Sequence, residues 1–369
     1  MNPADFDTSL PLSRARTIPA SWYFDPAAYR IERERVFAGS WQMVGRLAQV
    51  SGPGDYFTCE LADEPILVVR DNDDTLRAFY NVCRHRAAPL LTAPCGHVTK
   101  LRCRYHGWTY DLAGKLRGVP EFDGVEDFDR EGFGLREIPL DTFGGLVWIH
   151  PGEVTQSLAE FLSPIPEWMR SRGSDLSQLH FVRRVSYDVN CNWKVYVDNY
   201  LDGGYHIRTV HPELAGVLDY SQYRTAVYPS TSLQSSPLTG GDADDAANRT
   251  RKGDLAAYWW VWPNFMLNLY DGIADTNLVL PLGPDRCRVV FDFYFRDVEG
   301  ESAGAFMNES IAVGHRIQTE DIEICEEVQK GLRSSSYSTG RFSVRREIAG
   351  HHFHRLLGER FASGKQSLL

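Results

Sequence analysis

The stretch CRHRAAPLLTAPCGHVTKLRCRYH, residues 83–106, contains two pairs of cysteine and histidine. Cys83 and His85 form the first pair, Cys103 and His106 form the second, and 17 residues separate the pairs. Each pair is short enough for one turn to direct both side chains toward one point. Two thiolates with two imidazoles suit either a tetrahedral zinc ion or a 2Fe-2S cluster in which the histidines hold one iron. The spacing alone leaves both metals open.

The residues around these pairs point to one of the two. Gly107, Trp108 and Tyr110 follow the second pair directly, and Pro89 follows the first, as in two tight loops that cover a cluster. The pattern closely resembles the Rieske ferredoxin domain. That resemblance implies a 2Fe-2S cluster whose ligands are Cys83, His85, Cys103 and His106.

Short apolar segments surround the cysteine and histidine pairs. They are rich in Val, Ile, Phe, Tyr and Trp and are separated by Gly, Pro and Asp-Asn turns: GDYFTCEL, PILVVRD, LRAFYNVC, GWTYDL and GGLVWIH. This texture is typical of small antiparallel strands. We therefore expect an all-β domain over residues 40–150, with a helix up to Phe37 before it.

The remaining chain mixes helices and strands. The pattern predicts strands at 180–189, 256–270, 275–281 and 287–296, and helices at 193–218 and 303–332. The polar segment 239–254 is expected to be a loop that is mobile. The sequence thus predicts an α+β protein in which 1–39 and 151–369 form a second domain, an antiparallel sheet flanked by helices of the helix-grip type.

Composition excludes several classes of function. Lys and Arg total 39 against 49 Asp and Glu, a net charge of -10, which argues against nucleic acid and anionic lipid as partners. No stretch reaches the roughly 18 apolar residues of a membrane span, and the N-terminus lacks the features of a secretory signal. We expect a soluble cytoplasmic protein. Five cysteines outside the two pairs are expected to be small buried apolar residues: Cys59, Cys95, Cys191, Cys287 and Cys325.

A second histidine pair lies in DNYLDGGYHIRTVHP, residues 198–212. His206 and His211 are five positions apart, about 500° of rotation at roughly 100° per residue, so they do not share a face of a regular helix. The helix must end or distort between them. Pro212 disfavours the α conformation of His211, which lets the second histidine turn back toward the first.

The context of this pair resembles the catalytic domain of Rieske non-haem iron oxygenases, the ring-hydroxylating alpha-subunit family. NWKVYVDNYLDGGYH followed by VH is similar to the mononuclear iron motif of that family, and a Rieske domain precedes it in the same order. The resemblance implies a triad of two histidines and one carboxylate that leaves positions open for dioxygen. It also implies that Asn199 lies near the iron.

The carboxylate of this triad has to come from a later segment, and TEDIEICEEVQKGL, 319–332, offers five. One largely apolar helix face would carry Asp321, Cys325, Val328 and Leu332. An acid on an inward face requires a partner or a metal, so Asp321 is the predicted third ligand, in agreement with a late aspartate of the family, and Glu320 is the reserve. The alternative is an acid that is favoured by the helix dipole alone.

The glycine pair 203–204 departs from the family pattern. A carboxylate three residues before the first histidine usually bridges that histidine to a cluster histidine of the neighbouring subunit, and Gly203 occupies that position here. We expect Asp202, four residues before His206, to bridge to His106 of an adjacent chain in a homotrimer. Two glycines inside a helix would cost about 1 kcal/mol each relative to alanine, which suggests a close approach or a bulge.

The segment YWWVWPNFMLNLYDG, 258–272, suggests a substrate class. Its aromatic rings are either core or a cage for a quaternary ammonium group, with Tyr258, Trp260 and Trp262 on one strand face and Phe265 and Tyr270 close behind. Several segments of the second domain resemble the choline monooxygenase branch of the family, which favours the cage. The histidines of HHFHRLL, His351, His352 and His354, are expected to be structural or exposed.

Together these features predict an oxygenase component, a monooxygenase or dioxygenase, that uses O2 and a mononuclear Fe(II) to hydroxylate a quaternary or N-methylated amine such as choline or a betaine. No nicotinamide-binding fingerprint is present, so a separate NAD(P)H-dependent reductase or a ferredoxin would supply the electrons. The alternatives are hydroxylation of an aromatic ring, a Rieske electron carrier without its own chemistry, and a zinc-stabilised binding protein.

Overall fold

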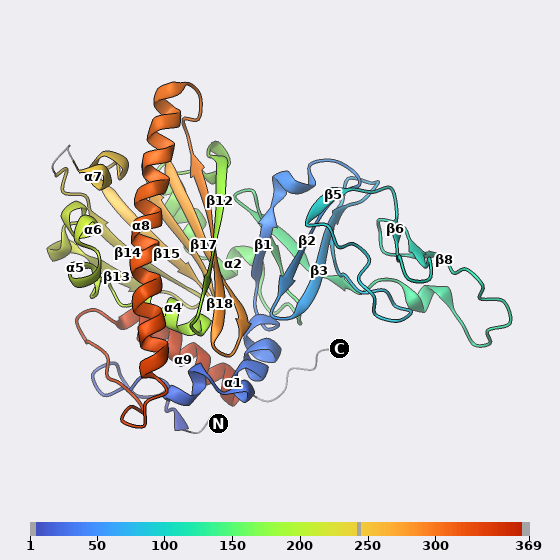
Figure 1. The fold of residues 1–369 in the computed structure, drawn as a ribbon, viewed down its shortest axis with the longest axis horizontal. Coiled ribbons are helices and arrows are strands. Elements are labelled where there is room, and N and C mark those ends of the chain that lie inside the picture. The colour runs from blue at the N-terminus through green and yellow to red at the C-terminus, as the bar shows by residue number, and fades with distance from the viewer. Residues whose placement is uncertain (1–4, 242–244, 364–369) are drawn as a thin grey trace. The chain divides into compact units, whose positions relative to one another are not determined.

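The computed structural model describes residues 5–241 and 245–363, and these residues form two compact units. One unit is Phe37–Leu158, and the other combines the segment up to Val36 with the chain from Ala159 onward. The first unit consists of strands, and the second combines one large sheet with helices (Figure 1). The predicted α+β class is confirmed.

The unit of residues 37–158 is built from three small antiparallel sheets. Their strand orders are β5-β2-β3-β4-β9, β1-β11-β10 and β6-β7-β8. The strands are β1 Gln42–Arg46, β2 Asp55–Leu61, β3 Glu64–Arg70, β4 Leu76–Tyr80, β5 Cys95–His97, β6 Leu101–Arg102, β7 Thr109–Tyr110, β8 Leu116–Gly118, β9 Glu137–Ile138, β10 Leu140–Phe143 and β11 Leu146–Ile149. One apolar cluster joins the larger sheet to the loops after β4 and β6, and it includes Cys83, Cys103 and Trp108.

The other unit is organised around a seven-stranded antiparallel sheet of order β12-β18-β17-β16-β15-β14-β13. The strands are β12 His180–Val189, β13 Arg224–Val227, β14 Thr231–Pro237, β15 Leu255–Val261, β16 Phe265–Tyr270, β17 Ile273–Gly283 and β18 Arg286–Phe295. The helices are α1 Pro26–Ile31, α2 Leu158–Phe161, α3 Ile165–Ser171, α4 Trp193–Tyr200, α5 Ile207–Val210, α6 Pro212–Val217, α7 Ala246–Thr250, α8 Glu301–Gly331 and α9 Ile348–Ala362. No helix of the described ranges is long and apolar enough to cross a membrane.

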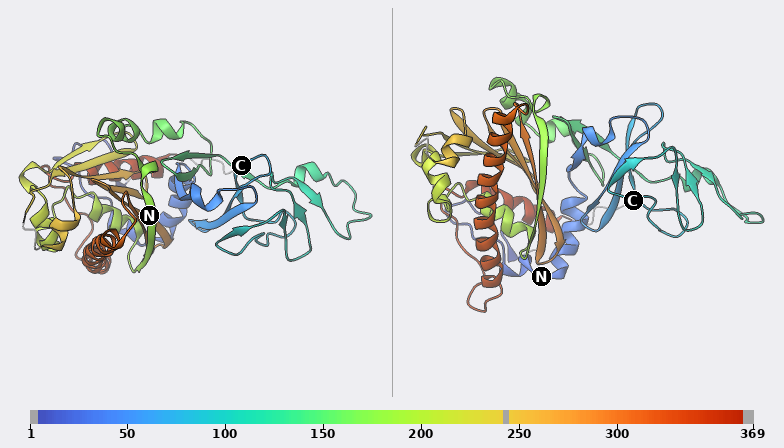
Figure 2. Two further views of the ribbon diagram at one scale, coloured as in Figure 1. Left: turned by 90° about the horizontal axis from the view of Figure 1, so that it is seen from above. Right: turned by 45° about the horizontal axis from the view of Figure 1, so that its top comes forward.

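Helices cover both faces of this sheet, and adjacent residues of β15 show how. Trp259 packs against Trp168 of α3 on one face, whereas Trp260 packs against Phe353 of α9 on the other. Helices α4 and α8 pack on each other, and α4 also packs on β17. Figure 2 shows the long α8, in orange-red, alongside the sheet. The side of the sheet that faces α4, α8 and α9 therefore becomes an interior between sheet and helices.

A buried charge pair fixes the start of α4. The Lys194 ammonium lies 2.5 Å from Glu32 Oε1 and 2.7 Å from Asn192 Oδ1, and the Trp193 indole donates to Glu32 Oε2 at 2.8 Å. Glu32 begins a π-helical segment, Glu32–Phe37, which directly follows α1. Burial lowers the pKa of Lys194, and Glu32 opposes that shift. The NWK segment thus ties α4 to the N-terminal helix.

Several predicted boundaries were wrong. The single strand expected at 256–270 is two strands, because Trp262–Asn264 forms a turn that contains a cis peptide bond before Pro263. The loop expected at 239–254 contains α7, in which Ala247 and Thr250 are buried, and residues 242–244 lie outside the described residues. Strands β13 and β14 were not predicted, because their polar residues, such as Gln234, hide the alternation of an apolar strand.

The five cysteines outside the two pairs differ in their environments. Cys191, Cys287 and Cys325 are buried, as expected, and the Sγ atoms of Cys191 and Cys287 lie 3.8 Å apart. Cys59 is half-buried and Cys95 is exposed, so the prediction that all five are buried was wrong. Cys95 lies on β5, the edge strand of its sheet, where one side of the strand has no neighbour to cover it.

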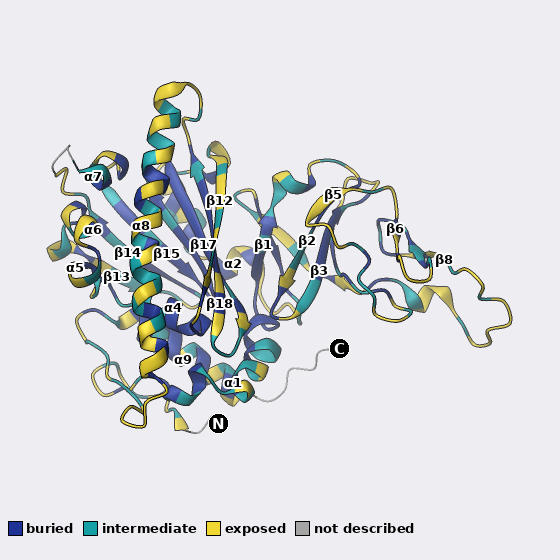
Figure 3. Cartoon of the chain, viewed as in Figure 1, coloured by how far each residue is buried: buried dark blue, intermediate teal, exposed yellow. Residues whose placement is uncertain are grey.

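Helix α8 has one buried side and one exposed side (Figure 3). Cys325 and Leu332 are buried as the face argument required, but Val328 is 44% exposed. The predicted apolar face was therefore wrong at Val328. The helix turns its Asp321 and Cys325 toward α4 and the sheet, while the side that carries Val328 and Glu327 meets solvent.

We predict that Glu32→Ala lowers the free energy of unfolding by about 3–5 kcal/mol, because it leaves the Lys194 ammonium buried without its carboxylate. Thermal and denaturant unfolding measure the loss. Glu34→Ala is the matched control on the same segment, since Glu34 is only partly buried. An equal effect of both substitutions would contradict a specific role of the buried pair.

Candidate active site

The two cysteine and histidine pairs occupy two similar turns. In the turn after β4, the Ala87 amide donates to the Cys83 carbonyl at 3.0 Å and the Cys83 amide donates to the Ala88 carbonyl at 2.9 Å. In the turn between β6 and β7, the Gly107 amide donates to the Cys103 carbonyl at 3.1 Å and the Cys103 amide to the Trp108 carbonyl at 2.8 Å. Each turn thus folds back on its cysteine.

The two cysteines and the two histidines differ in how far their side chains are buried. Both thiols are buried, whereas His85 is partly exposed and His106 is exposed. The two imidazole rings lie 4.7 Å apart, and His85 stacks on Trp108 with only 5° between the ring planes. The Tyr110 hydroxyl lies 3.6 Å from Cys83 Sγ.

A 2Fe-2S cluster fits this arrangement. His85 Nδ1 is buried and has no hydrogen-bond partner among the described residues, which is unusual for an imidazole nitrogen in an interior. Two thiols at the inner end and two imidazoles at the outer end match a cluster that has cysteines on one iron and histidines on the other. Cys83, Cys103, His85 and His106 would therefore hold a Rieske cluster.

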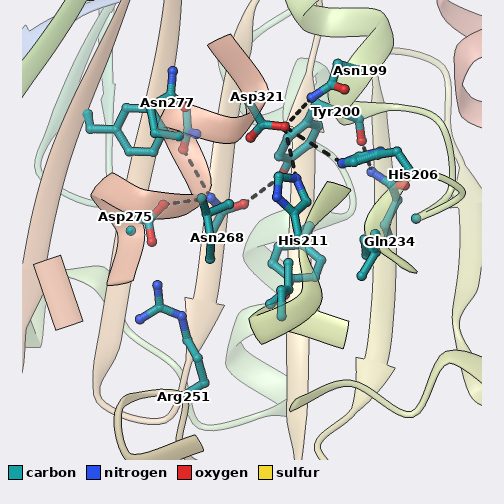
Figure 4. Close-up of a pocket in the computed structure, with 18 of the residues that line it drawn as sticks. Asn199, Tyr200, His206, His211, Gln234, Arg251, Asn268, Asp275, Asn277 and Asp321 are labelled. Atoms are coloured by element: carbon teal, nitrogen blue, oxygen red, sulfur yellow. Dashed lines mark hydrogen bonds and ion pairs between the residues drawn. The ribbon is translucent and has the colours of Figure 1, made fainter. Parts of the chain in front are cut away.

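The second histidine pair lies where α4 gives way to α5 and α6. His206 directly precedes α5, and His211 separates α5 from α6 with φ -119° and ψ 75°. The predicted departure of His211 from helical geometry before Pro212 is confirmed. The two rings lie 4.9 Å apart at an angle of 78°, so the chain reversal brings both imidazoles to one place (Figure 4).

Asp321 of α8 completes this group. Its Oδ1 lies 3.1 Å from His211 Nε2 and 3.8 Å from His206 Nε2. The ligand atoms of the three residues lie within 4.8 Å of one another. Asn199, in the last turn of α4, donates its Nδ2 hydrogen to Asp321 Oδ1 at 2.6 Å. The structure thus brings together every residue that the sequence proposed for this centre.

A further carboxylate stands behind each histidine. Asp202 Oδ2 lies 2.6 Å from His206 Nδ1, and Glu320 Oε2 lies 2.6 Å from His211 Nδ1. An Nδ1 proton held in this way leaves the Nε2 lone pair of each ring available to a metal. Glu320, the reserve third ligand, instead orients His211. Burial alone would lower the pKa of His211, but Asp321 and Glu320 outweigh it and raise the pKa.

A mononuclear metal fits this donor set. Two imidazole nitrogens and one carboxylate oxygen on one side of a point form the facial triad of non-haem iron sites. The Asp321 Oδ1 separations of 3.1 Å from His211 Nε2 and 3.8 Å from His206 Nε2 are within the roughly 4 Å that two ligand atoms of one ion can span. The same carboxylates that raise the His211 pKa would also stabilise a cation.

The glycine pair does not lie inside a helix, and that expectation was wrong. Helix α4 ends at Tyr200, and Gly203 and Gly204 both have φ of +71° in the turn that follows. A Cβ on Gly203 would lie 2.1 Å from the carbonyl oxygen of Arg346. The chain therefore needs glycine for a left-handed turn pressed against the segment before α9. Asp202 reaches His206 from this turn rather than along a helix face.

A cavity of about 110 Å³ lies beside the triad and has room for a small organic molecule, since one water molecule needs roughly 10–15 Å³. Its floor is a row of residues paired across the sheet, which therefore point to the same face. The row consists of Gln234, Tyr258, Asn268, Asp275 and Phe293. His206, His211 and Asp321 lie in the opposite wall (Figure 4).

The predicted aromatic cage was partly wrong. Tyr258 and Tyr270 line the cavity and their hydroxyls lie 2.8 Å apart. Trp260 and Trp262 instead pack against Phe353 of α9, and Phe265 is also outside the cavity wall. The rings that do line it come from several elements: Tyr196, Tyr200, Tyr223, Tyr258, Tyr270, Phe291 and Phe293.

The sequence did not indicate three polar groups of this cavity. Asp275 and Asn277 alternate on β17 and both point inward, a polar alternation that could have marked a polar floor. Arg251 follows α7 and was hidden in a segment that was expected to be a loop.

The histidines of α9 have other roles: His354 bonds to Asp198 at 2.8 Å, and His351 Nε2 lies 3.2 Å from the Leu10 carbonyl oxygen.

Comparison with known proteins gives the family. Residues 40–129 match the Rieske [2Fe-2S] domain, and residues 176–363 match the catalytic domain of ring-hydroxylating alpha subunits. The chain belongs to the Rieske non-haem iron oxygenases. This oxygenase is 40% identical over 362 residues to a chloroplastic choline monooxygenase of Arabidopsis thaliana, and the match covers 96% of this chain and 85% of the relative.

A bacterial enzyme and a solved structure are also similar to this chain. The carnitine monooxygenase oxygenase subunit of Escherichia coli K12 is 30% identical over 360 residues, 94% of each chain. A solved quaternary ammonium Rieske monooxygenase in complex with L-carnitine is 27% identical, with a TM-score of 0.81 over 98% of this chain and 99% of that one. The predicted family and enzyme class are confirmed, and the oxygenase uses a Rieske cluster and a mononuclear iron.

We predict that Glu320→Gln weakens binding of the mononuclear iron about 10- to 100-fold, because His211 loses the carboxylate that orients its Nδ1. Anaerobic titration with Fe(II) measures this affinity, and the visible spectrum of the Rieske cluster should not change. Glu323→Gln, at an exposed position of the same helix, is the control. Equal iron affinity of both variants would show that Glu320 does not position the ligand.

Proposed function

We propose that this oxygenase hydroxylates a small quaternary ammonium compound at a carbon bound to nitrogen. The observation that carries the proposal is the cavity beside the triad, where tyrosine and phenylalanine rings line the wall together with the carboxylate of Asp275, which lies on the sheet opposite the triad. Ring faces attract a quaternary ammonium group, and a buried carboxylate supplies the opposite charge. The choline and carnitine monooxygenases that this chain resembles act on compounds of this class.

The state of the wall residues supports binding of a cation. Burial raises the pKa of Tyr258 and Tyr270, so both rings stay neutral and present their faces and hydroxyls. Burial also raises the pKa of Asp275, and a bound cation would favour its charged form. Asn268 donates to Asp275 Oδ2 at 2.6 Å and accepts from the Tyr200 hydroxyl at 2.7 Å, which fixes the carboxylate in the floor.

The triad residues and their partners define the chemistry. His206, His211 and Asp321 would hold the iron, whose role when bound is to activate dioxygen. Asp202 and Glu320 keep the two imidazoles in the tautomer with a free Nε2, and Asn199 holds one Asp321 oxygen. One oxygen atom of O2 enters the C–H bond, and the other leaves as water with two electrons and two protons. Hydroxylation next to nitrogen would lead to N-demethylation or to an aldehyde.

The electrons would come from a separate NAD(P)H-dependent reductase or a ferredoxin and reach the cluster first. In our proposal Cys83, His85, Cys103 and His106 hold that cluster, and His106 is exposed in the single chain. Asp202, on the far side of His206 from the cavity, would then bridge to His106 of an adjacent chain in a homotrimer. Asp202 is largely buried and bonded to His206, which supports a path through this residue.

Hydroxylation of an aromatic ring is less compatible with the cavity. A hydrocarbon would give no partner to Arg251 Nε, which donates to no described atom, and no opposite charge to the buried Asp275 carboxylate, which is costly. An electron carrier without its own chemistry would not need the second donor set, and the match to the catalytic domain excludes that class.

We expect the reconstituted holoenzyme with a generic reductase to consume O2 and release a hydroxylated or demethylated product from quaternary ammonium compounds. Mass spectrometry identifies the product, and the panel should include choline, betaines and simple aromatics. Asp321→Ala is the control, since it should retain the Rieske spectrum and lose turnover. Turnover of aromatics alone, with no N-methylated compound oxidised, would overturn the proposal.

We expect electron transfer between chains to be visible in mixed oligomers. Cys103→Ser removes the cluster and Asp321→Ala removes the iron site, so each variant alone should be inactive, whereas co-assembled variants should regain activity. Adding Asp202→Asn to the Cys103→Ser chain should abolish the regained activity, because that chain supplies the iron. The same substitution in the Asp321→Ala chain is the matched control and should have little effect. Inactive mixed oligomers would argue for transfer within one chain.

A further inference from the structure

Arg251 places a buried positive charge in the wall of the cavity. The residue follows α7 and is only 7% exposed. Its Nη1 donates to Ser310 Oγ of α8 at 3.0 Å, and its guanidinium carbon lies 4.9 Å from the centre of the Tyr270 ring. Its Nε is buried and donates to no described atom. The Nε hydrogen therefore has no partner among the described residues, whereas other hydrogens of the guanidinium bond to Ser310 and to the Tyr270 hydroxyl.

No described carboxylate neutralises this charge by direct contact. Asp275 and Asp321 are the acids in the same cavity, and Asp275, at 6% exposure, lies on the sheet, but no ion pair within 4.0 Å joins either to Arg251. The Asp275 hydrogen bond comes from Asn268 instead. Figure 4 shows the Arg251 guanidinium extending into the cavity below Asp275. Arg251 and Asp275 thus line the same cavity without touching.

Helix α8 packs closely on this wall of the cavity. Gly314 lies within α8, and a Cβ there would be 3.2 Å from Phe293 Cε1 and 3.9 Å from Arg251 Nη2. A glycine inside a helix costs about 1 kcal/mol relative to alanine. At this position it keeps the helix from crowding Phe293, which lines the same cavity as Arg251.

An unpaired guanidinium in an interior is costly, and its planar fork matches a carboxylate in two parallel hydrogen bonds. A ligand that carries only a positive charge would meet Asp275 but leave Arg251 unpaired, and would bring two cations close together. A ligand with both charges would give each of the two side chains an opposite partner.

We infer that the substrate is a betaine, a quaternary ammonium compound that also carries a carboxylate. The carboxylate would bind Arg251, and the ammonium group would face Asp275 and the tyrosine rings. This inference rests on the proposed function and narrows it, because it disfavours amino alcohols such as choline. Arg251 is then a residue that determines specificity and takes no part in oxygen chemistry.

Calorimetric titration of the oxidised holoenzyme with glycine betaine and with its carboxamide tests the inference. Both ligands have the same trimethylammonium group and nearly the same shape, but only the first has a carboxylate. We expect the wild type to bind the acid at least about tenfold more tightly than the amide. In Arg251→Gln this ratio should fall close to one, with the affinity for the amide changed much less.

Arg249→Gln is the matched control, because Arg249 lies on α7 and pairs with Glu309 outside the cavity wall. It should keep the wild-type ratio. Arg251→Lys keeps the charge without the fork and should give an intermediate ratio, so a folding defect of Arg251→Gln does not remove the test. Equal binding of acid and amide by the wild type, or an unchanged ratio in a folded Arg251→Gln, would overturn the inference.

The same titration separates this inference from the proposed function. Binding of choline and the amide as tight as that of betaine would reject the role of Arg251 and leave a quaternary ammonium substrate in place. If none of the three compounds binds and no N-methylated compound of the turnover panel is oxidised, the proposed function itself fails.

Discussion

The central constraint of this oxygenase is that two imidazoles from one short segment must present their Nε2 atoms to a single point on α8. Asp202 and Glu320 hold the Nδ1 atoms from behind, at 2.6 Å each, and Asn199 holds Asp321. These contacts come from the turn after α4, from α4 itself and from α8. The positions of α4 and α8 relative to each other, and the left-handed turn at Gly203 and Gly204, follow from this requirement.

A buried ion pair outside the triad holds helix α4 in place. Lys194 and Glu32 are both fully buried, and each depends on the other because an isolated charge in the interior is strongly unfavourable. The pair connects α4 to the N-terminal segment, while His354 of α9 bonds to Asp198 one residue before Asn199. The last turn of α4 therefore has support from both ends of the described chain, which keeps Asn199 against Asp321.

The register of the sheet decides which side chains meet a substrate. Cross-strand pairing places Tyr258, Asn268 and Asp275 in one row, so a shift of one residue in any of these strands would replace a cavity residue by one from the opposite face. The long α8 closes the same space from above and contributes both Asp321 and the partner of Arg251. The sheet and α8 thus supply side chains on opposite walls of one cavity.

The sequence by itself identified the candidate metal ligands. Ligand chemistry restricts residue type and local spacing. The sequence therefore indicates the cysteine and histidine pairs at 83–106, the histidines at 206 and 211, and the acid at 321. Pro212 likewise restricts the backbone of the residue before it, His211, which is a local effect. Only the tertiary structure decided that Glu320 orients a histidine, that Trp260 is core whereas Tyr258 lines the cavity, and that Arg251 reaches the cavity. Each of these depends on strand register and helix packing between segments far apart in the chain, which no local pattern encodes.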